Sequence, residues 1–270
     1  MKTDSNFDPR AHRIGVLMGG LSAEREVSLD TGRGVVAALG ELGYPCAAID
    51  WAPDTSLPEL LAAHRVEVVW NALHGTYGED GAVQGLLACL GIRCTGSGIL
   101  ASALAMDKVA SKRLFEFHQL ATPKWATIAH DDDGEAVLHE WSPPLVIKPA
   151  QEGSSVGVTI VRSREQIPAA MAAARAYHGP TLIERYIAGA ELQVGILGDA
   201  VLGSIEVRPA LEFYDYQAKY KRGDTQYLIP AELSGDVVAR SEELALAAYR
   251  AVGCSGYGRV DMRIETRGDR

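Results

Sequence analysis

The charged side chains of the segment GGLSAEREVS lie where a small ligand could bind. Glu24, Arg25 and Glu26 follow a hydrophobic run typical of a buried strand and precede a run with helical spacing. Glycines leave backbone N–H groups accessible, the N-terminus of a helix favours anions, and ligands bind at the carboxyl ends of parallel strands. The segment therefore predicts a ligand-binding loop, with a solvated charged turn as the alternative. Its glycine spacing does not match a dinucleotide fingerprint.

Two further loops follow strand-like runs. NALHGTYGEDG holds His74 among glycines and acidic residues, so this histidine is either a ligand contact or a hydrogen-bonded structural group. KPAQEGSSVGV begins with Lys148 at the end of a hydrophobic run and places Ser154 and Ser155 between glycines. Backbone N–H groups and hydroxyls in such a loop can bind phosphates, although the sequence is not that of a Walker P-loop.

Two segments nearer the C-terminus combine charges with other chemical groups. FYDYQAKYKRGD places Lys219, Lys221 and Arg222 beside tyrosines. Such a mixture occurs in nucleic-acid sites, but the acidic chain favours a lid that closes on a charged small molecule, with an ordinary surface loop as the alternative. In GRVDMRIE, alternation along a strand places Arg259 and Asp261 on one face. They form either a plain salt bridge or an oxyanion-stabilising cation beside a magnesium ligand.

The overall composition excludes several classes of protein. The chain has 270 residues, of which 47% are hydrophobic and 23% charged, and a net charge of −9. These values exclude wholesale disorder and disfavour nucleic-acid binding. The sequence shows no apolar run long enough to cross a membrane and no signal peptide, and its four cysteines predict thiols outside disulfides, mostly buried. We therefore expect a cytoplasmic protein that binds neither membranes nor nucleic acids.

The order of the elements favours a parallel sheet covered by helices up to about residue 105, because strand and helix patterns alternate with short links. Beyond that point the pattern changes. We expect helices at 106–120, 164–178 and 241–253. We expect strands at 122–129, 143–150, 158–163, 256–265 and within 181–209, with turns at 188–190 and 198–199 and a loop at 213–227.

Seven segments follow one another in a fixed order: GGLSAEREVS, HGTYGEDG, TGSGILASALAMDK, VIKPAQEGSSVG, LIERYIAGAEL, FYDYQAKY and GRVDMRI. In this order they resemble the D-alanine–D-alanine ligases, members of the ATP-grasp superfamily. The resemblance runs from about residue 13 to the C-terminus. It implies an α/β ATP-grasp fold with an N-terminal Rossmann-like parallel-sheet subdomain (13–105), a central α+β ATP-lid subdomain (106–187) and an incomplete C-terminal subdomain (188–270). ATP would be held between the second and third.

The resemblance also implies which residues bind ATP. Lys108 and Lys148 would contact its phosphates. Glu184 and Arg185 would lie on the adenine side. At the position of Arg185 the family usually has lysine, and arginine keeps the charge but differs in geometry. Glu191 would bind the ribose hydroxyls.

A second implied group closes the site over the reactants. Ser155 would belong to a glycine-rich flap, and Lys219 would reach the γ-phosphate when the lid closes. Ser154, Glu24 and Tyr220 would form a hydrogen-bonded set across the closed site. Tyr220 also matches relatives that make a dipeptide, so D-lactate is the less favoured second substrate.

The remaining implied residues act on the substrates. Glu24 would hold the ammonium of the first D-alanine and His74 would lie near its carboxylate. Arg259 would stabilise the tetrahedral intermediate, and Asp261 would bind Mg²⁺ or Mn²⁺. The implied reaction is ATP-dependent ligation of two D-alanines through an acyl phosphate, for peptidoglycan precursors, cell-wall biogenesis and cell shape. The resemblance implies a homodimer.

One departure from the family concerns the metal. The family's Arg-x-Asp strand is followed by a Glu-x-Asn motif with further magnesium ligands, and this sequence ends before such a motif. We therefore expect a fragment of a longer enzyme with little activity alone. Two alternatives stay open: an ATP-grasp ligase for another pair of amino acids, and a non-catalytic nucleotide-binding chain.

Overall fold

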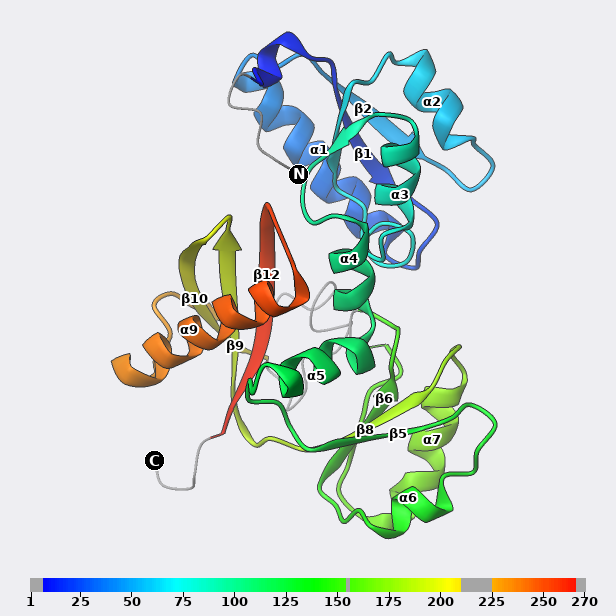
Figure 1. The fold of residues 1–270 in the computed structure, drawn as a ribbon, viewed down its shortest axis with the longest axis vertical. Coiled ribbons are helices and arrows are strands. Elements are labelled where there is room, and N and C mark those ends of the chain that lie inside the picture. Colours follow the sequence, from blue (N-terminus) through cyan, green and yellow to red (C-terminus); the bar gives the residue numbers. More distant parts are fainter. Residues whose placement is uncertain (1–6, 154–155, 210–224, 266–270) are drawn as a thin grey trace. The chain divides into compact units, whose positions relative to one another are not determined.

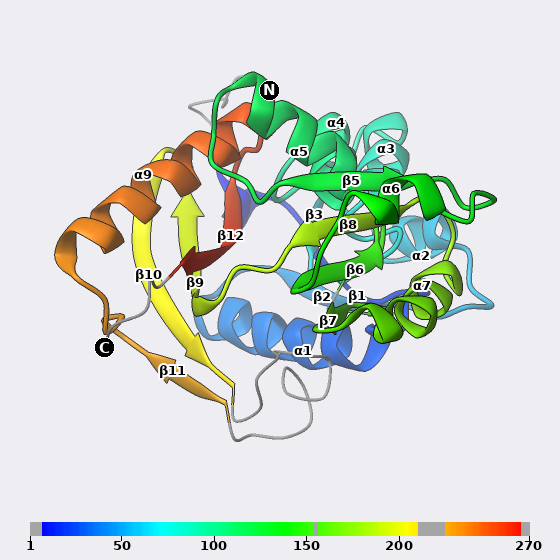
Figure 2. The same ribbon diagram turned by 90° about the horizontal axis from the view of Figure 1, so that it is seen from below.

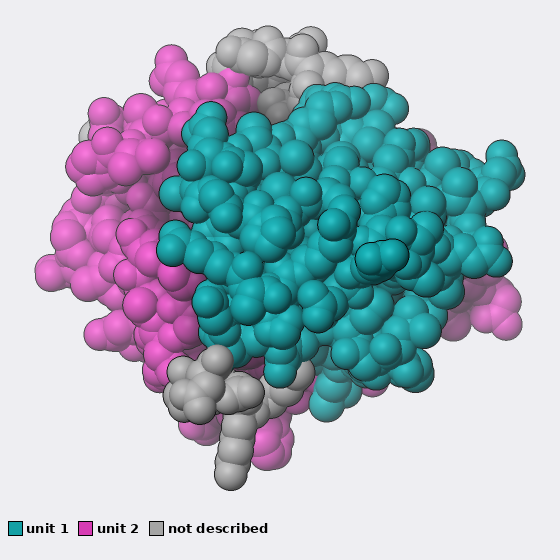
Figure 3. All heavy atoms as spheres, turned by 90° about the horizontal axis from the view of Figure 1, so that it is seen from above, with its two compact units in different colours: residues 1–103 teal, residues 104–270 magenta. Residues whose placement is uncertain are grey.

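The computed structural model describes residues 7–153, 156–209 and 225–265. The chain separates into two compact units, residues 1–103 (unit 1) and residues 104–270 (unit 2), which Figure 3 shows in different colours. The finer, three-part division expected from the sequence stays a prediction.

Helices and strands alternate through much of the described chain (Figure 1). The strands are β1 (Ile14–Gly19), β2 (Cys46–Trp51), β3 (Val68–Asn71), β4 (Arg93–Cys94), β5 (Trp125–Ile128), β6 (Leu145–Pro149), β7 (Thr159–Val161), β8 (Thr181–Arg185), β9 (Gly189–Leu197), β10 (Ala200–Arg208), β11 (Gln226–Leu228) and β12 (Tyr257–Glu265). The helices are α1 (Arg25–Glu41), α2 (Leu57–Ala63), α3 (Ala82–Cys89), α4 (Ile99–Met106), α5 (Lys108–Phe117), α6 (Glu135–His139), α7 (Ile167–Arg175) and α9 (Gly235–Val252), with 3-10 turns at Pro9–Ala11 and Arg164–Gln166.

Unit 1 is built on a parallel sheet with the strand order β2-β1-β3-β4. Because successive side chains of a strand point to opposite faces, β1 contributes to two hydrophobic cores. Val16 and Met18 pack with residues of α1, whereas Leu17 packs with residues of α2 and α3. Helices thus cover both faces, and the parallel pairing brings the carboxyl ends of β1 and β3 to one edge of the sheet.

The first sheet of unit 2 is antiparallel, with the order β5-β8-β6-β7. Ile147 of β6 and Ile183 of β8 belong to the core formed with α7. On the other face, Leu182 packs with Val109 of α5. Since side chains alternate along a strand, the even-numbered residues of β6 and β8 face α5.

The second sheet of unit 2 is also antiparallel, with the order β11-β10-β9-β12. α9 lies along one face of this sheet (Figure 2). Leu192 and Val194 of β9 pack with Ala245 of α9, and Met262 of β12 packs against the same core. The odd-numbered residues of β9 and β12 therefore face away from α9.

The predicted α/β class with an N-terminal parallel sheet is confirmed, but three local predictions are wrong. The turn predicted at 188–190 fails at Gly189 and Ala190, because both already pair with β12. Of the loop predicted at 213–227, residues 213–224 lie outside the described residues, and the prediction fails at its end, because Gln226 begins β11, which pairs with β10. The helix predicted at 241–253 begins earlier, at Gly235. The first two errors concern residues that pair with strands elsewhere in the chain, and local sequence patterns do not reveal such pairing.

Two expectations from composition can also be compared with the structure. In the described stretches, no helix combines the length and the apolar character that crossing a bilayer requires. All four cysteines lie in described stretches and none is in a disulfide, as predicted. Their expected burial is wrong for Cys89, which is exposed, while Cys46, Cys94 and Cys254 are half-buried.

Candidate functional site

Three lysines surround one glutamate on the α5 face of the first sheet of unit 2. Lys148 comes from β6 and Glu184 from β8, and the antiparallel register makes their side chains diagonal neighbours on one face. Lys108 and Lys112 lie one turn apart on α5, which packs over that face. We call Lys108, Lys112, Lys148 and Glu184 the lysine cluster. The structure thus brings together three of the residues predicted to bind ATP.

Glu184 is the centre of the lysine cluster. Its side chain is buried, and each carboxylate oxygen contacts an ammonium group: Oε1 lies 2.5 Å from Lys112 Nζ, and Oε2 contacts Lys148 Nζ. Burial raises the pKa of Glu184, but Lys148 and Lys112 outweigh this effect and hold that pKa below its ordinary value. The carboxylate is therefore ionised at neutral pH.

Lys108 stands at the start of α5, where the helix meets the end of β6. Its backbone N–H donates to the carbonyl of Ala150 at 3.0 Å, and its Nζ donates to the carbonyl of Glu152. Burial, and after it the neighbouring ammonium of Lys148, lower the pKa of Lys108 to about 8. An anion placed beside this side chain would favour its protonated form.

Asp107 fixes the position of Lys108. As the N-cap of α5, it accepts hydrogen bonds of 2.9 Å from the backbone N–H groups of Val109 and Ala110. Its other oxygen accepts a 2.9 Å hydrogen bond from the side chain of Gln151, the second residue after β6. Burial raises the pKa of Asp107, but these hydrogen bonds bring it below its ordinary value. The start of the helix is therefore tied to the end of the strand that carries Lys148.

Sequence reasoning missed Lys112. Besides Glu184, its Nζ contacts Thr122 Oγ1 at 2.6 Å and the carbonyl of Pro123 at 3.4 Å. Burial lowers the pKa of Lys112, although Glu184 opposes that shift. The spacing of four residues from Lys108 was the available signal, because it places both lysines on the same side of a helix.

Unit 1 carries the predicted loop residue Glu24 just before α1. Its side chain is buried, and Oε2 lies only 2.7 Å from where a Cβ on Gly75 would stand. Ser22 connects the two loops: its hydroxyl donates to the carbonyl of His74 at 2.7 Å and accepts from the N–H of Glu24 at 3.1 Å. We call Ser22, Glu24, His74 and Gly75 the Glu24 site. The loops after β1 and β3 therefore meet, as the parallel sheet predicts.

His74 points toward α1. Its Nε2 shares a 3.1 Å hydrogen bond with Thr31 Oγ1, and the ring is half-buried. The acidic residues near it organise their own loop, since Glu79 accepts from the N–H of Gly75 at 2.7 Å and Asp80 from that of Tyr77 at 2.8 Å. Those acids have a structural role, whereas His74 stands beside Glu24 at the carboxyl edge of the sheet.

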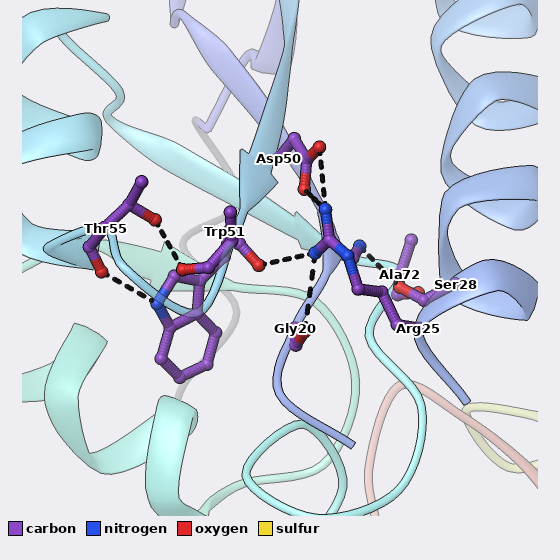
Figure 4. A network of polar contacts seen from close by, with 9 residues as sticks. Gly20, Arg25, Ser28, Asp50, Trp51, Thr55 and Ala72 are labelled. Carbon is purple, nitrogen blue, oxygen red and sulfur yellow. Dashed lines mark hydrogen bonds and ion pairs between the residues drawn. The ribbon is translucent and has the colours of Figure 1, made fainter. Parts of the chain in front are cut away.

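Arg25 and Ser28 hold the loop after β1 to the neighbouring strands (Figure 4). The guanidinium of Arg25 donates to both carboxylate oxygens of Asp50, at 2.7 and 3.0 Å, and to the carbonyl of Trp51 at 2.8 Å. The buried hydroxyl of Ser28 donates to the carbonyl of Ala72 at 2.8 Å. Arg25 was considered from sequence as a ligand contact, and the structure instead places it in this backbone network.

The second sheet of unit 2 carries charged residues on the face away from α9. Arg259 donates from Nε and Nη2 to the two carboxylate oxygens of Asp261, at 2.6 and 3.0 Å. On the same face, Arg263 Nη1 lies 3.4 Å from Glu191 Oε2, since the two residues are directly opposite across β9 and β12. The prediction that Arg259 and Asp261 share a face is confirmed, and they form the salt bridge that was one of its alternatives.

Arg185 lies apart from the lysine cluster. It ends β8, where it is exposed, and Nη1 lies 2.9 Å from Glu265 Oε1 of β12. Because adjacent residues of a strand point to opposite faces, its side chain does not join that of Glu184. The other predicted site residues, Ser154, Ser155, Lys219 and Tyr220, lie outside the described residues, as do Lys221 and Arg222 of the predicted lid.

The residues that the structure describes do not form a complete metal site. Across 7–153, 156–209 and 225–265, no three side chains of His, Cys, Asp or Glu gather as metal ligands do. Asp261, the predicted magnesium ligand, instead pairs with Arg259 through both oxygens. A divalent cation with hard oxygen ligands would need more oxygens than this one carboxylate supplies.

Each unit therefore offers a site with its own chemistry. The lysine cluster holds three ammonium groups, that of Lys112 buried and the other two half-buried, against the carboxylate of Glu184. This excess of positive charge within the cluster suits a polyanion such as a triphosphate. The Glu24 site presents a buried carboxylate at the edge of a parallel sheet, which suits a small cation such as an amino group.

Comparison with known sequences identifies similar proteins. The family model described as D-ala D-ala ligase N-terminus matches residues 52–97, and the one described as D-ala D-ala ligase C-terminus matches residues 113–270. A curated D-alanine–D-alanine ligase of Geobacter sulfurreducens is 46% identical over 261 residues, covering 95% of this chain and 81% of that protein.

Comparison with solved structures gives the same family. The chain resembles a D-alanine–D-alanine ligase of Bacillus anthracis with a TM-score of 0.82 and 37% identity, over 94% of this chain and 83% of that one. A structure named as that organism's ligase complexed with ATP matches with a TM-score of 0.81 and 33% identity, over 94% and 82%. The ATP-grasp fold expected from the sequence is thereby confirmed.

Proposed function

This chain belongs to the family of D-alanine–D-alanine ligases, ATP-dependent enzymes that join two D-alanines, and we propose which of its residues perform that reaction. ATP transfers its γ-phosphoryl group to the carboxylate of the first D-alanine. The amine of the second D-alanine then attacks the acyl phosphate, releasing phosphate and giving D-alanyl-D-alanine. The observation that carries this assignment is the lysine cluster.

Lys108 and Lys148 bind the phosphates of ATP. Both belong to a cluster in which positive charge exceeds negative charge, and the low pKa of Lys108, about 8, reflects burial and the neighbouring Lys148. Phosphates would relieve that repulsion, since phosphoryl transfer depends mainly on positioning and on neutralising negative charge. Glu184 orients Lys148, and its strand β8 supplies the backbone proposed to meet the adenine.

Glu24 and His74 bind the first D-alanine. The carboxylate of Glu24 is buried against Gly75, so an ammonium group placed beside it would gain a strong charge-assisted hydrogen bond. His74, held by Thr31, stands in the loop that meets Glu24 and is assigned to the substrate carboxylate. The two groups thus recognise the two charged ends of one amino acid.

Arg259 and Glu191 lie on the second sheet of unit 2, and each has a proposed role toward the reactants. Arg259 stabilises the oxyanion that forms when the second amine attacks, and Asp261 holds its guanidinium through two hydrogen bonds. Glu191, which Arg263 contacts, binds the ribose hydroxyls. The exposed Arg185 contributes to the adenine side only weakly, because its charge pairs with Glu265.

We propose that ATP is used with Mg²⁺ or Mn²⁺, with Asp261 supplying one ligand. The described residues alone do not fit a complete site for such an ion, so no step of the reaction is assigned to it. Ser154, Ser155, Lys219 and Tyr220 keep their roles in closing the site as predictions from the family resemblance. Closure is needed because acyl phosphates react readily with water.

The biological setting follows from the reaction. We propose that the chain serves peptidoglycan precursor synthesis, and with it cell-wall biogenesis and cell shape, in the cytoplasm. Its partners are the small molecules ATP and D-alanine rather than membranes or nucleic acids. A homodimer is the proposed assembly.

The test is release of ADP from this chain with ATP and magnesium, with and without D-alanine. L-Alanine serves as the control substrate, and mass spectrometry identifies the product. Release that depends on D-alanine and yields D-alanyl-D-alanine supports the proposal. Release only with another amino acid, found by screening D- and L-amino acids, would establish the alternative ligase. Tight ATP binding without turnover for any amino acid would favour the non-catalytic alternative over the ligase.

A further inference from the structure

We propose that Lys112 is a positioning residue for ATP, which engages one oxygen of Glu184 so that Lys148 stays available to the phosphates. This inference rests on the proposed function, because it deepens the role assigned to the lysine cluster. It concerns a residue that does not itself touch the nucleotide.

The contacts of Lys112 leave it no donor for a ligand. An ammonium group has three N–H donors. Those of Lys112 are matched by Glu184 Oε1 at 2.5 Å, Thr122 Oγ1 at 2.6 Å and the carbonyl of Pro123 at 3.4 Å. The side chain is also buried, with 6% of the residue exposed. Lys112 therefore acts on other protein groups rather than on a bound nucleotide.

Lys148 is in the opposite situation. Within the described stretches, its ammonium group has one charged partner, Glu184 Oε2, and its side chain is 18% exposed. One acceptor leaves two of its N–H donors for a ligand. Lys148 lies near the end of β6 and Lys108 at the start of α5, and the two ammonium groups are close enough to repel each other. One anion could therefore contact both lysines.

Glu184 connects the two lysines. Its buried carboxylate must be compensated by positive charge, and two ammonium groups share that task, one on each oxygen. Without Lys112, Lys148 would be the nearest remaining cation and would compensate the carboxylate alone. The two would then form a neutral pair, and Lys148 would be a weaker phosphate ligand. Lys112 thus affects ATP through Glu184.

The experiment compares Lys112→Met with Arg113→Met, which removes an exposed charge from the next position of α5. ATP affinity is measured by titration calorimetry, and Michaelis constants for ATP and D-alanine by ADP release. For Lys112→Met, we expect about tenfold weaker ATP binding and a matching rise in the Michaelis constant for ATP. The Michaelis constant for D-alanine should stay unchanged. Arg113→Met should have the ATP affinity and Michaelis constants of the wild type. Equal ATP affinities for the two variants would overturn the inference.

A second comparison separates positioning from general damage to the core. In the Lys112→Met Glu184→Gln double variant, no carboxylate captures Lys148, so ATP affinity should recover to that of Glu184→Gln alone. A double variant that binds ATP more weakly than Glu184→Gln would contradict the inference. This comparison also decides the question if Lys112→Met alone does not fold, as judged by circular dichroism.

Wild-type protein distinguishes failure of the inference from failure of the proposed function. If the wild type itself does not bind ATP, the proposed function is wrong, and the inference falls with it. If the wild type binds ATP and Lys112→Met binds it equally well, the inference alone is wrong.

Discussion

The lysine cluster and the Glu24 site are held together in different ways. In the lysine cluster, side chains from α5, β6 and β8 fix one another mainly through opposite charges. In the Glu24 site, Ser22 bonds to backbone, and Glu24 lies against a glycine with positive φ. The difference teaches which changes each site tolerates: the lysine cluster should respond to lost charge, and the Glu24 site to added volume.

The largest effect is expected for Lys148→Met. It removes a phosphate ligand and leaves Glu184 with Lys112, so kcat/KM should fall about 100-fold. Lys124→Met, which removes an exposed lysine of the same unit, is the matched control and should stay near the wild type. Steady-state ADP release measures both. If the Lys148→Met enzyme kept more than half of the wild-type kcat/KM, the charge of Lys148 would not be what this cluster contributes to the reaction.

The Glu24 site should respond to a single methyl group. In Gly75→Ala, the new Cβ would lie 2.7 Å from Glu24 Oε2 and displace the carboxylate. We expect the Michaelis constant for D-alanine to rise about tenfold, since a charge-assisted contact is lost, with ATP affinity unchanged. Gly91→Ala is the matched control, because Gly91 has a similar φ, +70° against +68°, and no neighbour within 4 Å of its added Cβ.

The two substitutions share the strain of a positive φ and differ in the contacts of the added Cβ with Glu24 and, less closely, with Ser22. Substrate kinetics and a thermal melt of each variant separate strain from displacement. If both variants change the Michaelis constant for D-alanine alike, the close approach of Glu24 to Gly75 does not matter for the substrate.

A smaller effect should link ATP binding to pH. Burial and Lys148 lower the pKa of Lys108 to about 8, while Glu184, Glu152 and Asp107 act in the opposite sense. Above pH 8 the side chain is mostly neutral in the unliganded protein, and bound phosphate would raise its pKa again. ATP binding at pH 8.5 should therefore take up on the order of half a proton.

Calorimetry in two buffers of different ionisation enthalpy measures that uptake. Lys108→Arg keeps the charge without titrating in this range, so it should bind ATP at pH 8.5 without the extra proton. Equal uptake by wild type and variant would show that another group titrates.

The smallest effect is expected at the exposed pair between Arg185 and Glu265. Both side chains are about half exposed, at 53% and 43%, so solvent screens their attraction. Glu265→Gln should change the free energy of unfolding by no more than about 0.5 kcal/mol. Chemical denaturation of this variant and of Glu243→Gln, at another exposed pair, makes the comparison. A loss twice that size for Glu265→Gln alone would mean that this pair is not an ordinary surface contact.

Much of the fold and part of the site could be predicted from local sequence. Alternating strand and helix patterns gave the parallel sheet of unit 1, and parallel strands brought the loops of Glu24 and His74 to one edge. Alternation along β12 placed Arg259 and Asp261 on one face. These features depend on residues near one another in the chain, or on a rule that holds for every parallel sheet.

The remaining features required the tertiary structure. β6 and β8 pair although β7 and α7 separate them in the chain, and that pairing makes Lys148 and Glu184 neighbours. Packing of α5 over the same face then adds Lys112, whose partner is 72 positions further along. Residue types determined that these groups could carry charge. Only burial and long-range pairing decided which charges meet and how far the pKa of Lys108 falls, because both depend on what surrounds a side chain in space.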